Sequence, residues 1–283
     1  MSKFDPYEHL NVTLNDDGTL TRYLNIPKLP ATGEDQILPG QTAVSKDVTL
    51  NADNKTWMRI YRPTQLSSNN KKLPIILFLH AGGWIDLSVA NVFCHETCNK
   101  MSHEIPAIVI GLEFRLAPEH RLPAQYDDAV ETINWVKNQA LDPKGDQWLR
   151  DYADYSRFYL YGASCGANIA YNAALRILQT KMEPLKIVGL IMNQPFIGGM
   201  NRDHRFCNPL QECDKEKLRS IGRCLVIGFG GDPLIDRQQE FVKMLVMSGV
   251  MVEAKFDDVG FHNIDMIDPR RAAAILDFIK EFV

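Results

Sequence analysis

The chain has 283 residues, 45% of them hydrophobic, and a formal net charge of −4. A chain of this length and composition can bury a large core, which excludes a disordered protein or a disulfide-stabilised miniprotein. The sequence has no basic patch interleaved with aromatic residues, so we expect no nucleic-acid partner. No apolar run reaches the roughly 18 residues that a membrane span needs, so we expect no membrane partner.

The cysteines show neither a disulfide framework nor paired metal-ligand spacing, and we expect reduced thiols and no metal. They are Cys94, Cys98, Cys165, Cys207, Cys213 and Cys224. The N-terminal segment is polar and lacks the apolar core of a signal peptide. Both features predict a cytoplasmic protein.

Residues 1–45 mix short apolar groups with proline and glycine, which predicts an arm lying on the rest of the chain. Residues 48–50 and 56–61 alternate as a strand pair does. From there, buried strands alternate with helices. The predicted strands are 74–79, 107–112, 158–161, 187–192, 224–228 and 250–256, and the predicted helices are 90–102, 124–139, 167–180, 241–248 and 272–282.

This alternation predicts the α/β class, with one domain over 1–283 and a mostly parallel central sheet covered by helices on both faces. In such sheets the functional residues lie in loops at the carboxyl ends of the strands. The motifs below all follow predicted strands.

The motif His80-Ala-Gly-Gly-Trp84 directly follows the first buried strand. Glycine lets a backbone approach a substrate closely. Lipases and esterases of the α/β-hydrolase class use an H-G-G-G-type loop at this place to bind an oxyanion. We expect the amides of Gly82 and Gly83 to be oxyanion donors, with the amide of Cys165 as a third, and His80 to brace the loop.

The central motif is Gly162-Ala-Ser164-Cys-Gly166, between an apolar run and an amphipathic run. The pattern G-x-S-x-G marks the nucleophile elbow, a sharp strand-to-helix turn with serine at its apex. The N-terminus of the following helix favours negative charge near that serine. Alone, the pattern also fits an ordinary turn that contains serine.

An acid and a base follow Ser164 in the order that α/β-hydrolases use. Asp232 follows the strand 224–228, where a carboxylate would orient a histidine. Asp236 is the alternative, although capping of the next helix is its expected role. His262 follows the last predicted strand. We expect Ser164 to be the nucleophile, His262 the base and Asp232 the acid, a constellation that needs no metal or organic cofactor.

The segment 113–128 contains charged residues that could be mistaken for an acid–base cluster. They are Arg115, Glu119, Asp127 and Asp128. We expect a structural role, in which Arg115 and Glu119 hold a long loop under the elbow.

Five motifs in this order resemble the plant carboxylesterases of the hormone-sensitive-lipase group, which also contains gibberellin receptors and hydroxyisoflavanone dehydratases. They are H-A-G-G-W, E-F-R-L-A-P-E-H-R-L-P-A, G-A-S-C-G-A-N-I-A-Y, G-D-P-L-I-D-R-Q and G-F-H. The resemblance runs from about Leu10 to the C-terminus. It implies an α/β-hydrolase fold and a serine carboxylesterase whose partner is a small acyl ester, such as an acetate, of a plant specialised metabolite. The expected assembly is a monomer or a weak homodimer.

Two alternatives stay open. Receptors of the group have lost the histidine, and dehydratases can carry threonine in place of the serine, so His262 and Ser164 favour an esterase. A receptor that binds a small molecule under the arm, and a lyase or cyclase that uses these residues for proton transfer, are the other hypotheses. Group members also carry a helical cap that is shortened here to residues 196–210. Either the cap is reduced, which predicts an open site, or the sequence lacks residues of the natural chain.

Overall fold

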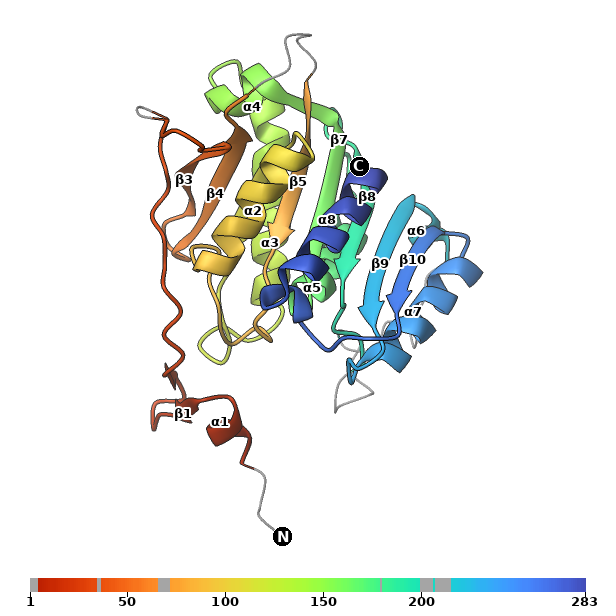
Figure 1. The fold of residues 1–283 in the computed structure, drawn as a ribbon. Helices are drawn as coiled ribbons and strands as arrows, with labels where there is room; N and C mark the ends of the chain where they lie inside the picture. Colours follow the sequence, from red (N-terminus) through yellow and green to blue (C-terminus); the bar gives the residue numbers. More distant parts are fainter. Residues whose placement is uncertain (1–4, 35–36, 66–71, 179, 199–205, 207–214) are drawn as a thin grey trace.

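Eight strands form one central sheet (Figure 1). They are β3 (Ala43–Asn51), β4 (Thr56–Pro63), β5 (Leu73–Leu79), β6 (Ile108–Glu113), β7 (Ala153–Ala163), β8 (Ile187–Asn193), β9 (Arg223–Phe229) and β10 (Met251–Asp257). The structure is a computed structural model that describes residues 5–34, 37–65, 72–178, 180–198, 206 and 215–283.

The strand order across the sheet is β10-β9-β8-β7-β5-β6-β4-β3. Strands β5 to β10 pair in parallel, and β4 is antiparallel to both β3 and β6. The predicted α/β class with a mostly parallel sheet is therefore confirmed. All seven residues of β5 are buried, as a strand covered on both faces requires, whereas the edge strand β10 is largely exposed.

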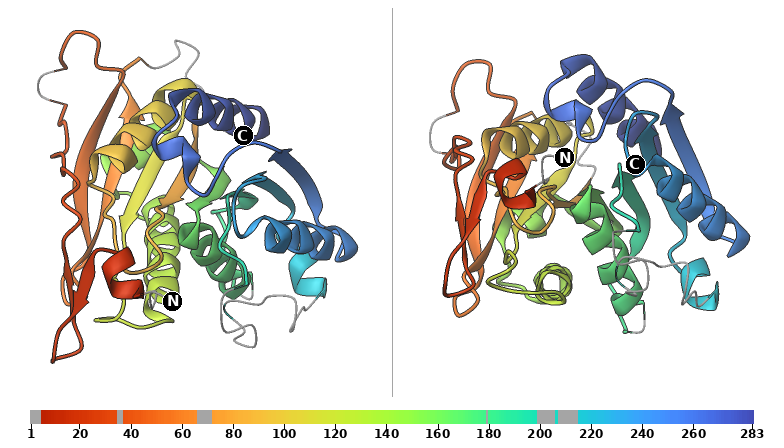
Figure 2. Two further views of the ribbon diagram at one scale, coloured as in Figure 1. Left: turned by 60° about the horizontal axis from the view of Figure 1, so that its bottom comes forward. Right: turned by 90° about the horizontal axis from the view of Figure 1, so that it is seen from below.

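Helices cover both faces of the sheet (Figure 2). The longer ones are α2 (Val92–Glu104), α3 (Ala124–Leu141), α5 (Cys165–Ile177), α7 (Ile235–Met247) and α8 (Pro269–Phe282), and the shorter ones are α1 (Pro6–His9), α4 (Gln147–Tyr152), α6 (Lys215–Arg219) and the 3₁₀ turn η1 (Ile264–Met266). Two apolar clusters fill the layers. One packs α3, α5 and α7 against the sheet, and the other packs α2 and α8 against its opposite face. None of the helices in the described ranges is long and apolar enough to cross a membrane.

Most predicted elements occur within a few residues of their expected bounds, and three differ more. Strand β7 begins at Ala153, five residues before the predicted start at 158. Helix α7 begins at Ile235 rather than at 241, because its first turns are polar and bury Gln238 instead of an apolar side chain. Strand β3 begins at Ala43, inside the segment 1–45 that was predicted to be an arm.

The rest of the arm contacts the body of the protein through hydrogen bonds. It contains α1 and a hairpin of β1 (Val12–Leu14) and β2 (Leu20–Arg22). Arg22 forms an ion pair with Glu119 at 2.7 Å and donates to the Ala117 carbonyl at 2.9 Å. Further along, the Leu29 amide donates to the Ala90 carbonyl.

The Arg22–Glu119 pair is expected to hold the arm in a pH-dependent way. The bond from Arg22 is the largest influence that lowers the pKa of Glu119, to about 2. A lowered carboxyl pKa means that the stabilisation is present above the ordinary pKa and is lost as the pH falls towards the folded value. Glu119→Gln is therefore expected to speed limited proteolysis of the arm about threefold at neutral pH, since a partly exposed pair contributes little. Asp154→Asn, which removes another partly exposed ion pair in which no residue of the arm takes part, is the control and should leave the cleavage rate unchanged.

Candidate active site

The strand β7 and the helix α5 meet at Ser164, which is 4% exposed and has φ 53° and ψ −118°. A positive φ is strained for a residue with a Cβ atom. The turn is so tight that a Cβ atom on Gly162 would lie 2.2 Å from the Gly166 carbonyl, and one on Gly166 would lie 2.1 Å from the Leu79 oxygen. Both glycines are therefore required by close backbone contacts.

Three predicted side chains form a continuous hydrogen-bonded chain at the carboxyl ends of the strands. Ser164 Oγ lies 2.8 Å from His262 Nε2. His262 Nδ1 lies 2.7 Å from Asp232 Oδ2. With Nδ1 donating to the carboxylate, the lone pair of Nε2 faces the serine hydroxyl, which is the arrangement that a general base needs.

Asp232 is held in its ionised form by donors from several elements. Burial alone would raise the pKa of this carboxyl, but hydrogen bonds from His262, the Leu234 amide and Gln238 outweigh it and lower the pKa below its ordinary value. The Leu234 amide donates at 2.8 Å and Gln238 Nε2 at 2.9 Å. The carboxylate therefore keeps its charge and its orientation toward the imidazole.

The capping role expected for Asp236 is wrong. Helix α7 begins at Ile235, so Asp236 lies inside the first turn, and the position before the helix is Leu234. The free amide of Leu234 is satisfied by Asp232 instead. Asp236 has no hydrogen bond to His262. Asp232, the residue predicted to be the acid, is the one that contacts His262.

The loop after β5 carries two glycines in left-handed conformations. Gly82 has a φ of +118° and Gly83 a φ of +61°. Within the described ranges, no backbone carbonyl accepts a hydrogen bond from the amides of Gly82, Gly83 or Cys165. No backbone partner within the described ranges therefore competes with a substrate oxygen for these amides.

The Cys165 side chain lies beneath this loop rather than in the site. Its Sγ accepts a hydrogen bond from the Trp84 amide at 3.3 Å. Burial raises the pKa of the Cys165 thiol to about 11, although nearby amides lower it. The thiol is thus protonated at neutral pH and unsuited to be a nucleophile.

His80 is fully buried and stacks on Phe114, with ring centroids 4.1 Å apart. Its Nδ1 lies 2.6 Å from the Ala81 carbonyl. Burial lowers the pKa of His80, so the ring is neutral at neutral pH. These contacts fit the bracing role predicted for it.

The charged residues of the segment 113–128 form separate pairs rather than one cluster. Arg115 binds Asp128 at 2.6 Å, and Asp127 binds Arg176 of α5 at 2.6 Å. Glu119 instead holds the arm. All four residues therefore have structural partners, as expected, although the loop is tied to the arm as well as to the body of the protein.

Two polar residues near the site were missed in the sequence. Asn193 is the last residue of β8, Gln194 follows it, and both are fully buried. Their one signal was their place at the carboxyl end of a buried strand, where functional residues gather. No chemical motif marks them, because amides neither titrate nor attack.

The described part of the chain contains no group of three histidine, cysteine, aspartate or glutamate side chains that could hold a metal ion. Its cysteines are free and buried at positions 94, 98, 165 and 224. The predicted cap region, 196–210, falls mostly outside the described residues, as do Cys207 and Cys213.

Comparisons with known proteins agree with this fold. A family profile described as alpha/beta hydrolase fold matches residues 76–200 and 191–266. An esterase from Pyrobaculum calidifontis has the same fold, with a TM-score of 0.68 and 20% identity over 85% of each chain. The fold thus defines the α/β-hydrolase class.

Relatives in plants define the family more closely. Probable carboxylesterase 9 of Arabidopsis thaliana is 45% identical, covering 99% of this chain and 97% of its own. The 3-O-acetylpapaveroxine carboxylesterase CXE1 of Papaver somniferum is 39% identical, covering 99% and 97%. The chain belongs to this plant carboxylesterase family of the α/β-hydrolases, and its enzyme class is that of the carboxylic ester hydrolases.

The alignment with the Arabidopsis relative extends over 317 positions, more than the 283 residues of this chain. The relative therefore has residues without a counterpart in this chain. The two segments matched by the family profile overlap at 191–200, which includes the first residues of the predicted cap region, 196–210.

The two loop glycines are expected to differ sharply when each is replaced by alanine. A Cβ atom on Gly82 would lie 2.1 Å from the Asp86 carbonyl oxygen, so the loop must move, whereas Gly83 has no atom within 4 Å of such a Cβ. Gly82→Ala should lower kcat about 10²–10³-fold, the usual cost of one lost oxyanion donor. Gly83→Ala, which adds only left-handed strain, should stay within about tenfold of the wild type. Equal kcat values for the two folded variants would contradict this assignment.

Proposed function

We propose that the protein is a serine carboxylesterase that hydrolyses small acyl esters of plant specialised metabolites through an acyl-enzyme. The observation that carries the proposal is the hydrogen-bonded chain from Ser164 through His262 to Asp232. In the first step His262 Nε2 takes the proton of Ser164 as its Oγ attacks the ester carbonyl. The protonated imidazole then gives that proton to the departing alcohol.

The negative charge of the tetrahedral intermediate falls on the former carbonyl oxygen. The amides of Gly82, Gly83 and Cys165 are proposed to bind it, assisted by the N-terminus of α5. Asp232 keeps His262 in the required tautomer and stabilises the imidazolium. Water then attacks the acyl-enzyme with His262 again as base, which releases the acid and restores Ser164.

The substrate class is inferred from the family. By its name, the poppy relative acts on an acetylated compound, 3-O-acetylpapaveroxine. An acetyl group is small, and a reduced cap would leave the alcohol side of the site open. We therefore expect activity to fall as the acyl chain lengthens and to tolerate varied alcohols.

The proposal is tested by hydrolysis of p-nitrophenyl acetate, butyrate and octanoate by the wild type and by Ser164→Ala. The wild type should hydrolyse the acetate fastest, and the variant should be at the background rate. Equal rates for the two proteins would contradict the proposal. A folded wild type that binds small molecules saturably without turnover would instead support the receptor alternative.

A lyase is the second candidate, because the chain is also 35% identical to 2-hydroxyisoflavanone dehydratase of Glycyrrhiza echinata, over 65% of this chain and 56% of that protein. Reaction in H₂¹⁸O separates the two. An esterase places one ¹⁸O atom in the acid product, whereas a dehydratase incorporates none into its product.

A further inference from the structure

The dipeptide Asn193-Gln194 lies beside the elbow at the end of β8, and both residues are fully buried. The Asn193 carbonyl accepts a hydrogen bond from the Ser164 amide at 2.9 Å, and the Gln194 amide donates to the Ile227 carbonyl of β9 at 2.8 Å. Gln194 has a φ of +48°, which residues with a Cβ atom rarely adopt. The backbone of this dipeptide is thus tied to the nucleophile on one side and to the strand before Asp232 on the other.

The side chains of the same dipeptide reach the loop of the base. Gln194 Oε1 accepts a hydrogen bond from the Asn263 amide at 2.6 Å, and its Nε2 donates to Asp265 Oδ1 at 2.8 Å. Asn193 Nδ2 donates to Asp265 Oδ2 at 3.1 Å. Asn263 directly follows His262, so Gln194 holds the backbone at the base itself.

The loop of His262 also packs on Gly230 and Gly231, where an added Cβ atom would lie 2.4 Å from the Asp258 oxygen and 2.1 Å from the Gly260 oxygen. It follows the edge strand β10, and its residues Val259 and Phe261 are 68% and 46% exposed. Among the described residues, the imidazole hydrogen-bonds to Ser164 and Asp232. The position of the base therefore depends on how its backbone is anchored.

We propose that Gln194, held in place by Asp265, is a positioning residue that sets His262 Nε2 against Ser164 Oγ. The inference rests on the proposed esterase function. Gln194 touches neither of these reacting atoms, so it acts through the backbone of the residue after the base. The buried Asn193-Gln194 dipeptide then links the nucleophile, the strand before the acid and the base.

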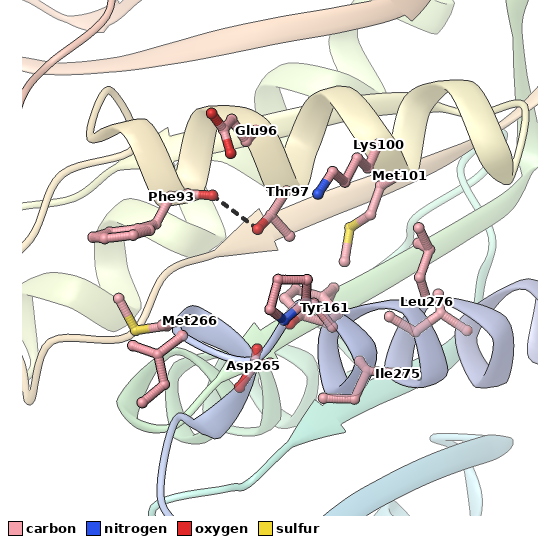
Figure 3. Close-up of a pocket in the computed structure, with 14 residues that line it drawn as sticks. Phe93, Glu96, Thr97, Lys100, Met101, Tyr161, Asp265, Met266, Ile275 and Leu276 are labelled. Atoms are coloured by element: carbon pink, nitrogen blue, oxygen red, sulfur yellow. Dashed lines mark hydrogen bonds between the residues drawn. The ribbon is translucent and has the colours of Figure 1, made fainter.

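Asp265 is the member of this network that borders a cavity of about 190 Å³ between α2 and α8 (Figure 3). Tyr161 of β7 and, from α2, Glu96 and Lys100 line the same cavity. Burial raises the pKa of Asp265 despite its two amide donors and the nearby His262. The carboxylate thus tolerates little additional negative charge.

The first test is Gln194→Met, which keeps the size of the side chain but removes its hydrogen bonds to Asn263, Asp265 and Asn193. Small misplacements of a catalytic group can cost about 10²-fold, so kcat for p-nitrophenyl acetate should fall about 10–100-fold while KM stays within about threefold. Lys100→Met is the control, because Lys100 lines the same cavity but forms no hydrogen bond with Asn193, Gln194 or Asp265. Its kcat should equal that of the wild type.

The second test is Gln194→Glu, which can still accept the bond from Asn263 but places a carboxylate beside Asp265. Two adjacent carboxylates cannot both ionise easily, and sharing one proton restores the lost donor. The ratio of variant to wild-type kcat should therefore rise as the pH is lowered from about 9 to about 6.

The proposal is overturned if folded Gln194→Met retains kcat within twofold of the wild type, or if the Gln194→Glu ratio does not change with pH. Should Gln194→Met fail to fold, Asp265→Asn takes its place. That side chain offers one acceptor oxygen to two donors, and about a fivefold loss of kcat is expected. If the wild type hydrolyses the ester and Ser164→Ala does not, the esterase function stands whichever way these variants behave.

Discussion

Ser164→Ala is expected to lower kcat for p-nitrophenyl acetate by about 10⁶-fold, because removing the nucleophile ends the covalent route and leaves only binding and the oxyanion amides. The side chain lost is small and its backbone bonds remain, so the melting temperature should change little. Stopped-flow kinetics should show an initial burst of p-nitrophenol, which is released as the acyl-enzyme forms, in the wild type but not in the variant.

Ser156→Ala is the matched control, because Ser156 lies on the same strand, β7, but is exposed and far from His262. Its kcat should equal that of the wild type. A Ser164→Ala protein that is folded and hydrolyses the ester within tenfold of the wild type would rule out Ser164 as the nucleophile.

Asp232→Asn is expected to lower kcat by about 10⁴-fold with little change in KM. The amide of asparagine would donate to His262 Nδ1, which moves the imidazole proton to Nε2 and takes the lone pair away from Ser164. Stability should change as well. The pKa of Asp232 is lowered in the folded state, so its ionised form stabilises the protein above the ordinary carboxyl pKa and ceases to do so at lower pH. The variant should therefore melt below the wild type at about pH 7, and the difference should shrink at about pH 3.

Asp236→Asn serves as the control for this substitution. Asp236 lies only four residues further on, in the first turn of α7, and has no bond to His262. Its kcat should stay within twofold of the wild type. If instead Asp236→Asn is the variant that loses activity, the acid of the triad has been assigned to the wrong residue.

The core of the fold was predictable from the sequence because its signals are local. Continuous apolar runs marked the buried strands, and Gly162 and Gly166 marked a turn that only glycine fits. Ser164, His262 and Asp232 could be chosen from many similar residues because each follows a strand, and the carboxyl ends of parallel strands meet at one edge of a sheet. Their contact in space follows from topology rather than from any one motif.

The parts that sequence reasoning missed depend on contacts between distant segments. The early start of helix α7 was missed because its first turns bury the polar side chain of Gln238, which binds Asp232. A polar side chain gives no apolar periodicity to detect. Gln194 reaches the loop of the base 69 residues later in the chain. Neither contact leaves a pattern in its own neighbourhood, so only the structure reveals them.

The proposed mechanism rests on the claim that Ser164 is the residue that becomes acylated. Its most direct test is mass spectrometry of the protein after reaction with diethyl p-nitrophenyl phosphate, an organophosphate that mimics the tetrahedral intermediate and stays on the nucleophile. One diethylphosphoryl group on the peptide containing Ser164, loss of esterase activity in step with labelling, and no label on Ser164→Ala are the predicted results. A label on another residue that abolishes activity, or full activity in a protein labelled at Ser164, would contradict the claim.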